Sequence, residues 1–208
     1  MKLYHFPLSS NSRRVLAVAF HLGIELELEA LQLFNGEHLK PEFIKLNPNH
    51  KIPTLVDGDF ILWESAAIML YLAGKKPGNR LYSSDSREQA DINRWLFWNA
   101  AHWGQACGIY IFENLIKKHT NQGEPDPVEL KKADGLFHRF ARVLDDHLSA
   151  HQWLSGNHLT VADYAVGAIL MQADKAHFPV ENYREILRWY GEIEKLDAWK
   201  KSAPENFM

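Results

Sequence analysis

The sequence predicts an α+β protein in which a small mixed module is followed by an all-helical region. Short apolar or alternating runs, separated by one helical pattern, give the order β-α-β and then β-β-α before residue 78. Beyond that point the chain carries only helical periodicity. We therefore expect two domains, residues 1–78 and residues 84–208, joined by the Lys-Lys-Pro-Gly-Asn stretch at 75–79.

The elements of the first module follow from local patterns. A short strand at residues 2–6 precedes apolar residues at helical spacing from Val15 to Leu22. Residues 24–33 alternate between apolar and polar side chains, which is typical of a half-buried strand, and residues 41–44 carry a short helical piece. Two β runs then flank Asp57-Gly58, a strong hairpin signal. An apolar helix at 66–73 follows, with Gly74 as its expected C-cap.

The remaining helices have recognisable starts. An aromatic-rich helical pattern covers residues 85–118, and Asp126-Pro127 opens the next helix as N-cap and first residue. The expected buried stripe of that helix is Leu130, Ala133, Phe137, Phe140, Leu144 and Leu148. Thr160 and Asp163 form a capping box for an apolar helix to about residue 176, and a last helix covers 183–196. We expect Thr160 and Asp163 to be structural, with a lost cap costing about 0.5–2 kcal/mol.

Composition limits the class of protein. Hydrophobic residues make up 46% of the 208 residues and charged residues 24%, so a packed core is possible. The net charge of −3 argues against a nucleic-acid partner. The single cysteine, Cys107, excludes an intramolecular disulfide, fits a reducing compartment and is best interpreted as a small buried residue. Without an apolar run of about 18 residues or a signal-peptide core, we expect a cytoplasmic protein with no membrane partner.

Hydroxyl and amide side chains gather where the first strand meets the first helix, at Ser9-Ser10-Asn11-Ser12. The N-terminus of a helix carries unpaired N–H groups and favours anions. A serine at this position can either cap the helix or hydrogen-bond a bound anion. Judged on the residue types alone, capping is the simpler interpretation of Ser9.

Four separated motifs together resemble the cytosolic glutathione transferases, and the likeness covers essentially the whole chain. The motifs are Leu8-Ser9-Ser10-Asn11-Ser12-Arg13-Arg14, Asn47-Pro48-Asn49-His50-Lys51-Ile52-Pro53, Trp63-Glu64-Ser65-Ala66-Ala67-Ile68 and Leu159-Thr160-Val161-Ala162-Asp163-Tyr164. The resemblance is to a serine-type member, either plant-type or theta-like, or to a bacterial relative. It implies a thioredoxin-like N-terminal domain followed by an all-α C-terminal domain.

The resemblance also implies how glutathione is held. The thiol would be activated by Ser9, with Ser10 and then Asn11 as the next candidates; counting from Pro7 and from Arg13 both favour Ser9. The implied glutathione-binding residues are Ser9, His38, Lys51, Ile52, Pro53, Glu64 and Ser65.

Each of these groups has an expected partner on glutathione. A cis bond before Pro53 would present the Ile52 backbone to the peptide, Glu64-Ser65 would meet the γ-glutamyl end, and His38 with Lys51 would meet the glycyl carboxylate. The plain alternatives are an ordinary N-cap at Glu64-Ser65 and solvated loop residues at His38 and Lys51.

The second substrate is expected between the domains, with Leu8, Trp103 and Tyr110 as candidate contacts, although aromatic residues at such spacing more often form core. Tyr4 is a less favoured candidate for thiol activation, because the serine turn fits better. No metal is expected.

The implied reaction is conjugation of the glutathione thiolate to a small electrophile, by a homodimer. The alternatives are another glutathione-dependent enzyme (a peroxide or disulfide reductase, an isomerase or a dehalogenase) and a non-enzymatic interaction module of the same fold.

Overall fold

The computed structural model describes residues 1–207, and the chain forms two compact units. The first unit combines Met1–Tyr82 with the C-terminal segment that starts at Lys195, and the second is Ser83–Glu194. The predicted α+β class, with one mixed module and one helical region, is confirmed. No helix within residues 1–207 has the length and apolar character needed to cross a bilayer.

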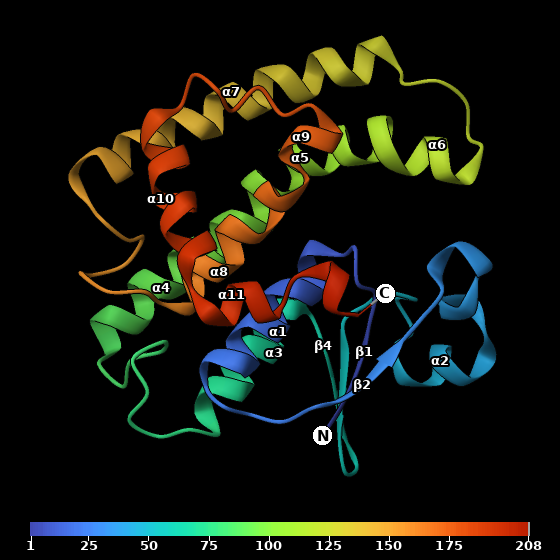
Figure 1. Ribbon diagram of the computed structural model, residues 1–208, viewed down its shortest axis with the longest axis vertical. Coiled ribbons are helices and arrows are strands. Elements are labelled where there is room, and N and C mark those ends of the chain that lie inside the picture. Colours follow the sequence, from blue (N-terminus) through green and yellow to red (C-terminus); the bar gives the residue numbers. More distant parts are fainter. Residues whose placement is uncertain (208) are drawn as a thin grey trace. The chain divides into compact units, whose positions relative to one another are not determined.

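Four short strands form the sheet of the first unit, in the order β2-β1-β3-β4 (Figure 1). They are β1 (Lys2–His5), β2 (Glu27–Ala30), β3 (Thr54–Asp57) and β4 (Phe60–Trp63). β1 and β2 are parallel, whereas β3 is antiparallel to both β1 and β4. Gly58 takes a φ of 62° between β3 and β4, so the hairpin prediction is confirmed. β2 is shorter than the alternating run at 24–33 because it pairs only opposite the four residues of β1.

Three α-helices and two 3₁₀ turns complete the N-terminal part of this unit. They are α1 (Ser10–His21), η1 (Leu33–Asn35), η2 (Glu37–Leu39), α2 (Pro41–Leu46) and α3 (Ser65–Gly74). α1 and α3 lie side by side (Figure 1), and Val15 and Ile68 from these helices are fully buried, as are Leu3 and Leu55 from the sheet. Burial of such a side chain contributes about 1.5–3 kcal/mol.

The expected C-cap of α3 was wrong. Gly74 lies inside the helix, and Lys75 is the capping residue. The backbone amide of Lys75 donates to the carbonyl groups of Tyr71 and Leu72, so the helix ends without a left-handed glycine.

The second unit begins with one continuous helical path in which two π-helical segments interrupt α-helix. Its parts are α4 (Ser86–Trp98), η3 (Asn99–Trp103), α5 (Gly104–Ile111), η4 (Phe112–Ile116) and α6 (Lys117–Thr120). The helical pattern at 85–118 is therefore confirmed, but the π segments were not predicted. Gly104 permits the first of them, because a Cβ atom there would lie 2.8 Å from the carbonyl oxygen of Asn99.

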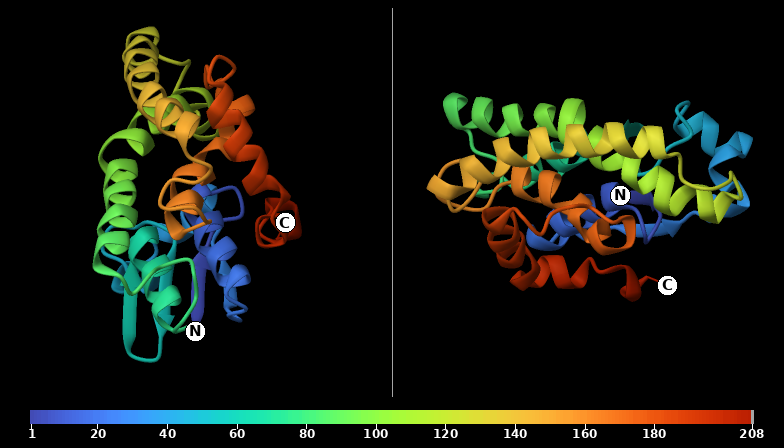
Figure 2. Two further views of the ribbon diagram at one scale, coloured as in Figure 1. Left: turned by 90° about the vertical axis from the view of Figure 1, so that its left-hand side faces the viewer. Right: turned by 90° about the horizontal axis from the view of Figure 1, so that it is seen from above.

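α7 (Pro127–Ala150) is the longest helix of the described chain and packs beside α5 (Figure 2). Asp126 caps it, as predicted, by accepting a hydrogen bond from the amide of Val128 at 2.8 Å. Along the predicted stripe, Leu130 and Phe140 are only half-buried, and Ala141 belongs to the buried face instead. The buried members of the predicted stripe are Ala133, Phe137, Leu144 and Leu148.

The apolar stretch after Thr160 is helical, but not as one α-helix. It consists of α8 (Val161–Gly167), the 3₁₀ segment η5 (Ala168–Gln172) and α9 (Ala173–Ala176). After a loop, α10 (Arg184–Lys195) follows.

The C-terminal segment differs from the expected domain boundary. We expected residues 84–208 to form one helical domain, but the chain from Lys195 on belongs to the first unit. This segment contains α11 (Asp197–Lys201) and the 3₁₀ turn η6 (Pro204–Asn206). Its buried Trp199 packs against Arg13 of α1, a long-range contact that no local pattern reveals.

The predicted capping box at the start of α8 is confirmed and does more than cap. Asp163 accepts from the amide of Thr160 at 2.8 Å, as a capping box requires. The same carboxylate accepts from the amide of Leu154 at 3.0 Å and from the indole N–H of Trp189 at 2.9 Å. Asp163 is completely buried, so it ties the preceding loop and α10 to the start of α8.

Replacing Asp163 with alanine should therefore cost more than a lost cap. Asp163→Ala removes the acceptor of four buried donors, which are the amides of Leu154 and Thr160, the Thr160 hydroxyl and the Trp189 indole N–H. Each donor left unpaired costs about 1–3 kcal/mol. We expect the free energy of unfolding, measured by urea denaturation, to fall by at least about 3 kcal/mol. Asp126→Ala, which removes a more exposed cap, is the control, with an expected loss of about 0.5–2 kcal/mol. Equal losses for the two variants would contradict this account of Asp163.

Candidate functional site

The register of the sheet brings four segments with candidate residues to one edge, which is the side of the sheet where β1, β2 and β4 end and β3 begins. Tyr4 near the end of β1 pairs with Thr54 at the start of β3, and Thr54 pairs with Trp63 at the end of β4. β2 is parallel to β1 and ends beside it, with Ala30 opposite His5. The turn after β1, the loop after β2, the approach to β3 and the segment after β4 therefore all leave the sheet at the same edge.

The turn after β1 carries Ser9 as the N-cap of α1. The Ser9 hydroxyl oxygen accepts from the amide of Ser12 at 3.3 Å, so the capping interpretation is correct. A hydroxyl also has one hydrogen to donate, and that of Ser9 has no acceptor within residues 1–207. Capping and contact with a bound anion are therefore compatible at this residue.

The other polar residues of the turn have different surroundings. Ser12 is fully buried, and its hydroxyl accepts from the amide of Phe6 at 3.2 Å. The carbonyl of Phe6 in turn accepts from the amide of Ser9 at 3.0 Å. Ser10 is half-buried as the first residue of α1, and Asn11 is exposed. Within the helix, the amides of Ser10 and Asn11 have no partner, so they are open to an anion.

The approach to β3 is organised by Asn47, a buried residue that the sequence analysis did not single out. Its side-chain amide donates to the carbonyl of Lys51 at 2.8 Å and to the hydroxyl of Thr54 at 3.1 Å. The bond between Ile52 and Pro53 is cis, as the resemblance implied. Sheet pairing of β3 with β1 begins only at Thr54, so the backbone of Ile52 is left outside the ladder.

His38 lies in η2, after β2, and has an unsatisfied ring nitrogen. Its Nδ1 is buried and has no hydrogen-bond partner within the described residues. Burial, and then the neighbouring His50, lowers the pKa of His38 below its usual value. His50 itself has a left-handed backbone with a φ of 56°. His50 was missed as a candidate, although its place in the motif beside Lys51 was a usable signal; Lys51 is exposed.

The segment after β4 starts α3 without an ordinary N-cap. Glu64 takes a φ of 72°, which is unusual for a residue with a side chain, and its carboxylate makes no capping bond. Strain of this kind costs about 1–3 kcal/mol and is concentrated at functional sites. The first amides of α3, beginning with buried Ser65, are thus left without a cap. The plain N-cap interpretation of Glu64-Ser65 does not account for this geometry.

A buried cation lies close to Glu64. Arg14 of α1 is almost completely buried, and its Nε has no hydrogen-bond partner within residues 1–207. Burial lowers the pKa of Arg14 to about 10, and the charge of Glu64 opposes that shift. Arg14 therefore remains a cation at neutral pH and places positive charge near the N-terminus of α3.

The candidates for the second substrate have contrasting positions. Leu8, in the turn of the first unit, is 36% exposed. Trp103 is completely buried in the second unit, where its indole N–H donates to the carbonyl of Val166 at 3.2 Å. Tyr110 is 7% exposed, and the rings of both Trp103 and Tyr110 pack on Phe137. These surroundings are those of core residues, as the alternative interpretation stated.

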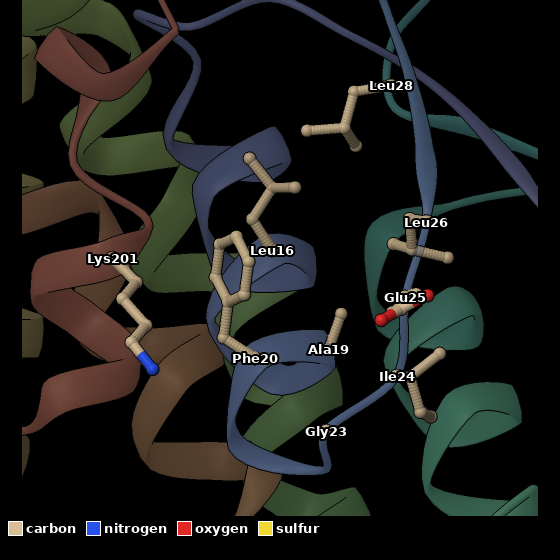
Figure 3. A pocket seen from close by; sticks show the side chains of 9 residues that line it. All are labelled: Leu16, Ala19, Phe20, Gly23, Ile24, Glu25, Leu26, Leu28 and Lys201. Carbon is tan, nitrogen blue, oxygen red and sulfur yellow. The ribbon is translucent and has the colours of Figure 1, made fainter.

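Two further features lie away from the predicted residues. Cys107 is buried, and this burial raises the pKa of its thiol well above its usual value. A hollow of about 480 Å³ lies between α1, the chain at 24–28 and Lys201, with Leu16, Leu26 and Leu28 among its lining side chains (Figure 3). It contains none of the predicted site residues.

Comparison with known proteins gives concordant matches in both parts of the chain. Residues 1–74 match the model of the glutathione S-transferase N-terminal domain, and residues 125–192 match that of the C-terminal domain.

Solved structures match over nearly the full length. Glutathione transferase F7 from Populus trichocarpa is 26% identical with a TM-score of 0.87, over 97% of this chain and 96% of its own. A delta-class glutathione transferase of Nilaparvata lugens is 31% identical with a TM-score of 0.83, over 98% and 93%. Glutathione S-transferase III in its apo form is 30% identical with a TM-score of 0.84, over 97% and 94%.

Proposed function

Because this chain belongs to the glutathione transferase family, we propose that it conjugates the thiolate of glutathione to small electrophilic compounds, with Ser9 as the activating residue. The observation that carries the proposal is the meeting of the four candidate segments at one edge of the sheet. Each segment offers hydrogen-bonding or charged groups that match a different part of glutathione.

Recognition of the peptide is divided among these segments. The uncapped amides at Ser65 and the carboxylate of Glu64 suit the α-carboxylate and the ammonium group of the γ-glutamyl end. The backbone of Ile52 suits pairing with the extended middle of the peptide. His38, His50 and Lys51 offer positive charge or N–H donors to the glycyl carboxylate.

Activation of the thiol follows from the free Ser9 hydrogen. A free thiol has a pKa of about 8.5, and lowering it by two units requires about 2.7 kcal/mol. A hydrogen bond to a charged group supplies about 1.5–3 kcal/mol, and the N-terminus of α1 adds roughly 0.3–1 kcal/mol. Ser9 and the helix together are sufficient, so the thiol proton leaves to solvent and the thiolate attacks the electrophile.

Ser9→Ala should lower kcat about ten-fold or more. It should change glutathione binding little below about pH 6, where the bound thiol is protonated, because the lost bond is made mainly to the thiolate. Turnover with an activated aryl halide and ultraviolet absorbance of the bound thiolate from pH 5 to 9 measure both quantities. Ser10→Ala and Asn11→Ala are the matched controls. A wild-type rate in Ser9→Ala, with a loss in either control, would move the role to that residue.

Failure of the wild type in the same assays would favour the alternatives. A thiolate band without turnover of the aryl halide would favour another glutathione-dependent reaction. Glutathione binding without a thiolate band would favour a glutathione-binding module or chemistry driven by the second substrate. No binding at all would favour a non-enzymatic interaction module.

The affinity for glutathione should also depend on pH through His38. The pKa of His38 is lowered in the free protein, and a bound carboxylate would raise it by stabilising the protonated ring. Affinity is therefore greatest below the pKa of free His38 and falls as pH rises through the pKa of His38 in the complex. We expect a decrease of about three- to ten-fold between pH 5 and 8 in the affinity for S-methylglutathione, measured by calorimetry. This ligand is used because its sulfur cannot ionise, whereas ionisation of the glutathione thiol would strengthen binding as pH rises.

Two comparisons identify the groups behind this pH dependence. His38→Gln should flatten the profile, and so should S-methylglutathione whose glycyl carboxylate is esterified. An unchanged profile in both cases would show that His38 does not meet this carboxylate.

We also propose a homodimer, as in the family. Large apolar side chains are exposed on β4, including Phe60 and Trp63, and Phe97 on α4 is 73% exposed. Phe97→Asp should raise the dimer dissociation constant at least about ten-fold in sedimentation velocity. The control is Val128→Asp, at an equally exposed position of α7. A monomeric wild type at micromolar concentration, or equal effects of the two variants, would contradict this assignment.

The electrophile contact proposed here is Leu8, which is exposed beside the serine turn. The proposal includes the usual setting of the family, detoxification of electrophiles in the cytoplasm. The free, buried Cys107 agrees with a reducing compartment and with a reaction that uses no protein thiol.

A further inference from the structure

The C-terminal segment lies along the helix that starts at the serine turn. α11 is next to α1 (Figure 1), and both elements belong to the first unit. Figure 3 shows Lys201 of α11 beside Phe20 of α1. The segment follows the whole helical unit in the chain, yet it packs on the helix whose first turn carries the candidate site.

Arg13 joins α1 to the C-terminal segment through contacts with Trp199 and Ser202. Its guanidinium carbon lies 3.8 Å from the ring centroid of Trp199, which is a cation–π arrangement. Its Nη2 donates to the carbonyl of Trp199 at 3.4 Å, and its Nε donates to the hydroxyl of Ser202 at 3.4 Å. Trp199 and Ser202 are both buried, and the Ser202 hydroxyl also donates to the Trp199 carbonyl at 2.7 Å. The guanidinium group therefore contacts partners whose positions are held by burial.

The end of the segment contacts the other side of the turn. The ring of Phe207 lies 5.7 Å from that of His5 in an edge-to-face arrangement, and 6.4 Å from Phe20 in a stacked one. His5 is the buried last residue of β1. The C-terminal segment thus contacts the residue before the turn and, through Arg13, the first turn of α1 after it.

A direct hydrogen bond connects Arg13 to the candidate catalytic residue. The amide of Arg13 donates to the carbonyl of Ser9 at 2.9 Å, the first backbone bond of α1. The position of the Ser9 backbone is therefore tied to that of Arg13. Misplacement of a reacting group by about 1 Å can cost 100-fold in rate, so such support matters for the hydroxyl.

We propose that Trp199, Ser202 and Phe207 form a C-terminal clamp that positions the Ser9 hydroxyl, with Arg13 as the positioning residue through which the clamp acts. This inference rests on the proposed function of Ser9. It assigns a role to a segment that follows the helical unit in sequence and returns to the mixed unit in the fold.

Two variants of Arg13 test the clamp. Arg13→Gln removes the charge and the fork, whereas Arg13→Lys keeps a cation but loses the fork. The matched control is Arg87→Gln, because Arg87 is exposed in the first turn of α4 and its side chain has no partner within residues 1–207. All variants are compared with wild type and Ser9→Ala at a temperature where melting curves show them folded.

The decisive readouts are the pKa of the bound glutathione thiol and the separate values of kcat and KM. We expect both Arg13 variants to raise the thiol pKa by about 0.5–1 unit and to lower kcat about three- to ten-fold, with KM for glutathione changed less than about two-fold. Amide hydrogen exchange of residues 6–13 should accelerate in both variants and stay at the wild-type rate in Arg87→Gln.

The outcomes separate the clamp from the function on which it rests. If wild type produces a thiolate that Ser9→Ala abolishes, but Arg13→Gln leaves the thiol pKa and kcat unchanged, the clamp is overturned even if the variant melts earlier. Full activity in Arg13→Lys also overturns it, because charge alone would then suffice. A wild type that forms no thiolate overturns the proposed function and the clamp together.

Discussion

The register of the four-stranded sheet is the constraint on which the site depends. Because β3 runs antiparallel to β1 and β4, the start of β3 lies at the edge where β1 and β4 end. A slip of one residue would turn the side chains of a strand to the opposite face and would move Thr54 away from Tyr4 and Trp63. The fully buried Leu3 and Leu55, paired across β1 and β3, oppose such a slip. Core packing therefore fixes the position of the segments that carry the candidate site residues.

The first residues of helices provide most of the polar groups at this edge. The helices differ in how their first amides are capped. At α1, Ser9 caps the helix and keeps a hydrogen to donate. At α3, Glu64 adopts an unfavourable backbone conformation, and its side chain leaves the first amides of the helix uncapped. At α8, away from this edge, Thr160 and Asp163 satisfy the helix and are buried. The same type of local signal thus marks the proposed binding site in one case and a structural contact in another, and the difference lies in which donors remain unpaired.

Much of the local structure of the candidate site was predictable because its signals are local. A serine before a helix, a hairpin glycine and the Glu64-Ser65 motif depend on neighbours in sequence, and each appears where expected. Residues whose role comes from tertiary contacts were missed. Asn47 acts through the Lys51 carbonyl and the Thr54 hydroxyl, and Arg14 through burial beside Glu64. The sequence pattern around Trp103 was ambiguous, because aromatic residues at helical spacing occur both in binding pockets and in cores.

By itself, the sequence determined the fold class, the start of each major helix, the hairpin and the motifs that resemble glutathione transferases, because propensity, capping and periodicity act over a few residues. Only the tertiary structure decided that the chain beyond Lys195 joins the first unit and that Trp103 lies in the core. Those outcomes depend on contacts between residues far apart in sequence, such as Arg13 with Trp199 and Trp103 with Val166. Such contacts depend on which buried surfaces fit together, and short-range patterns carry no information about that fit.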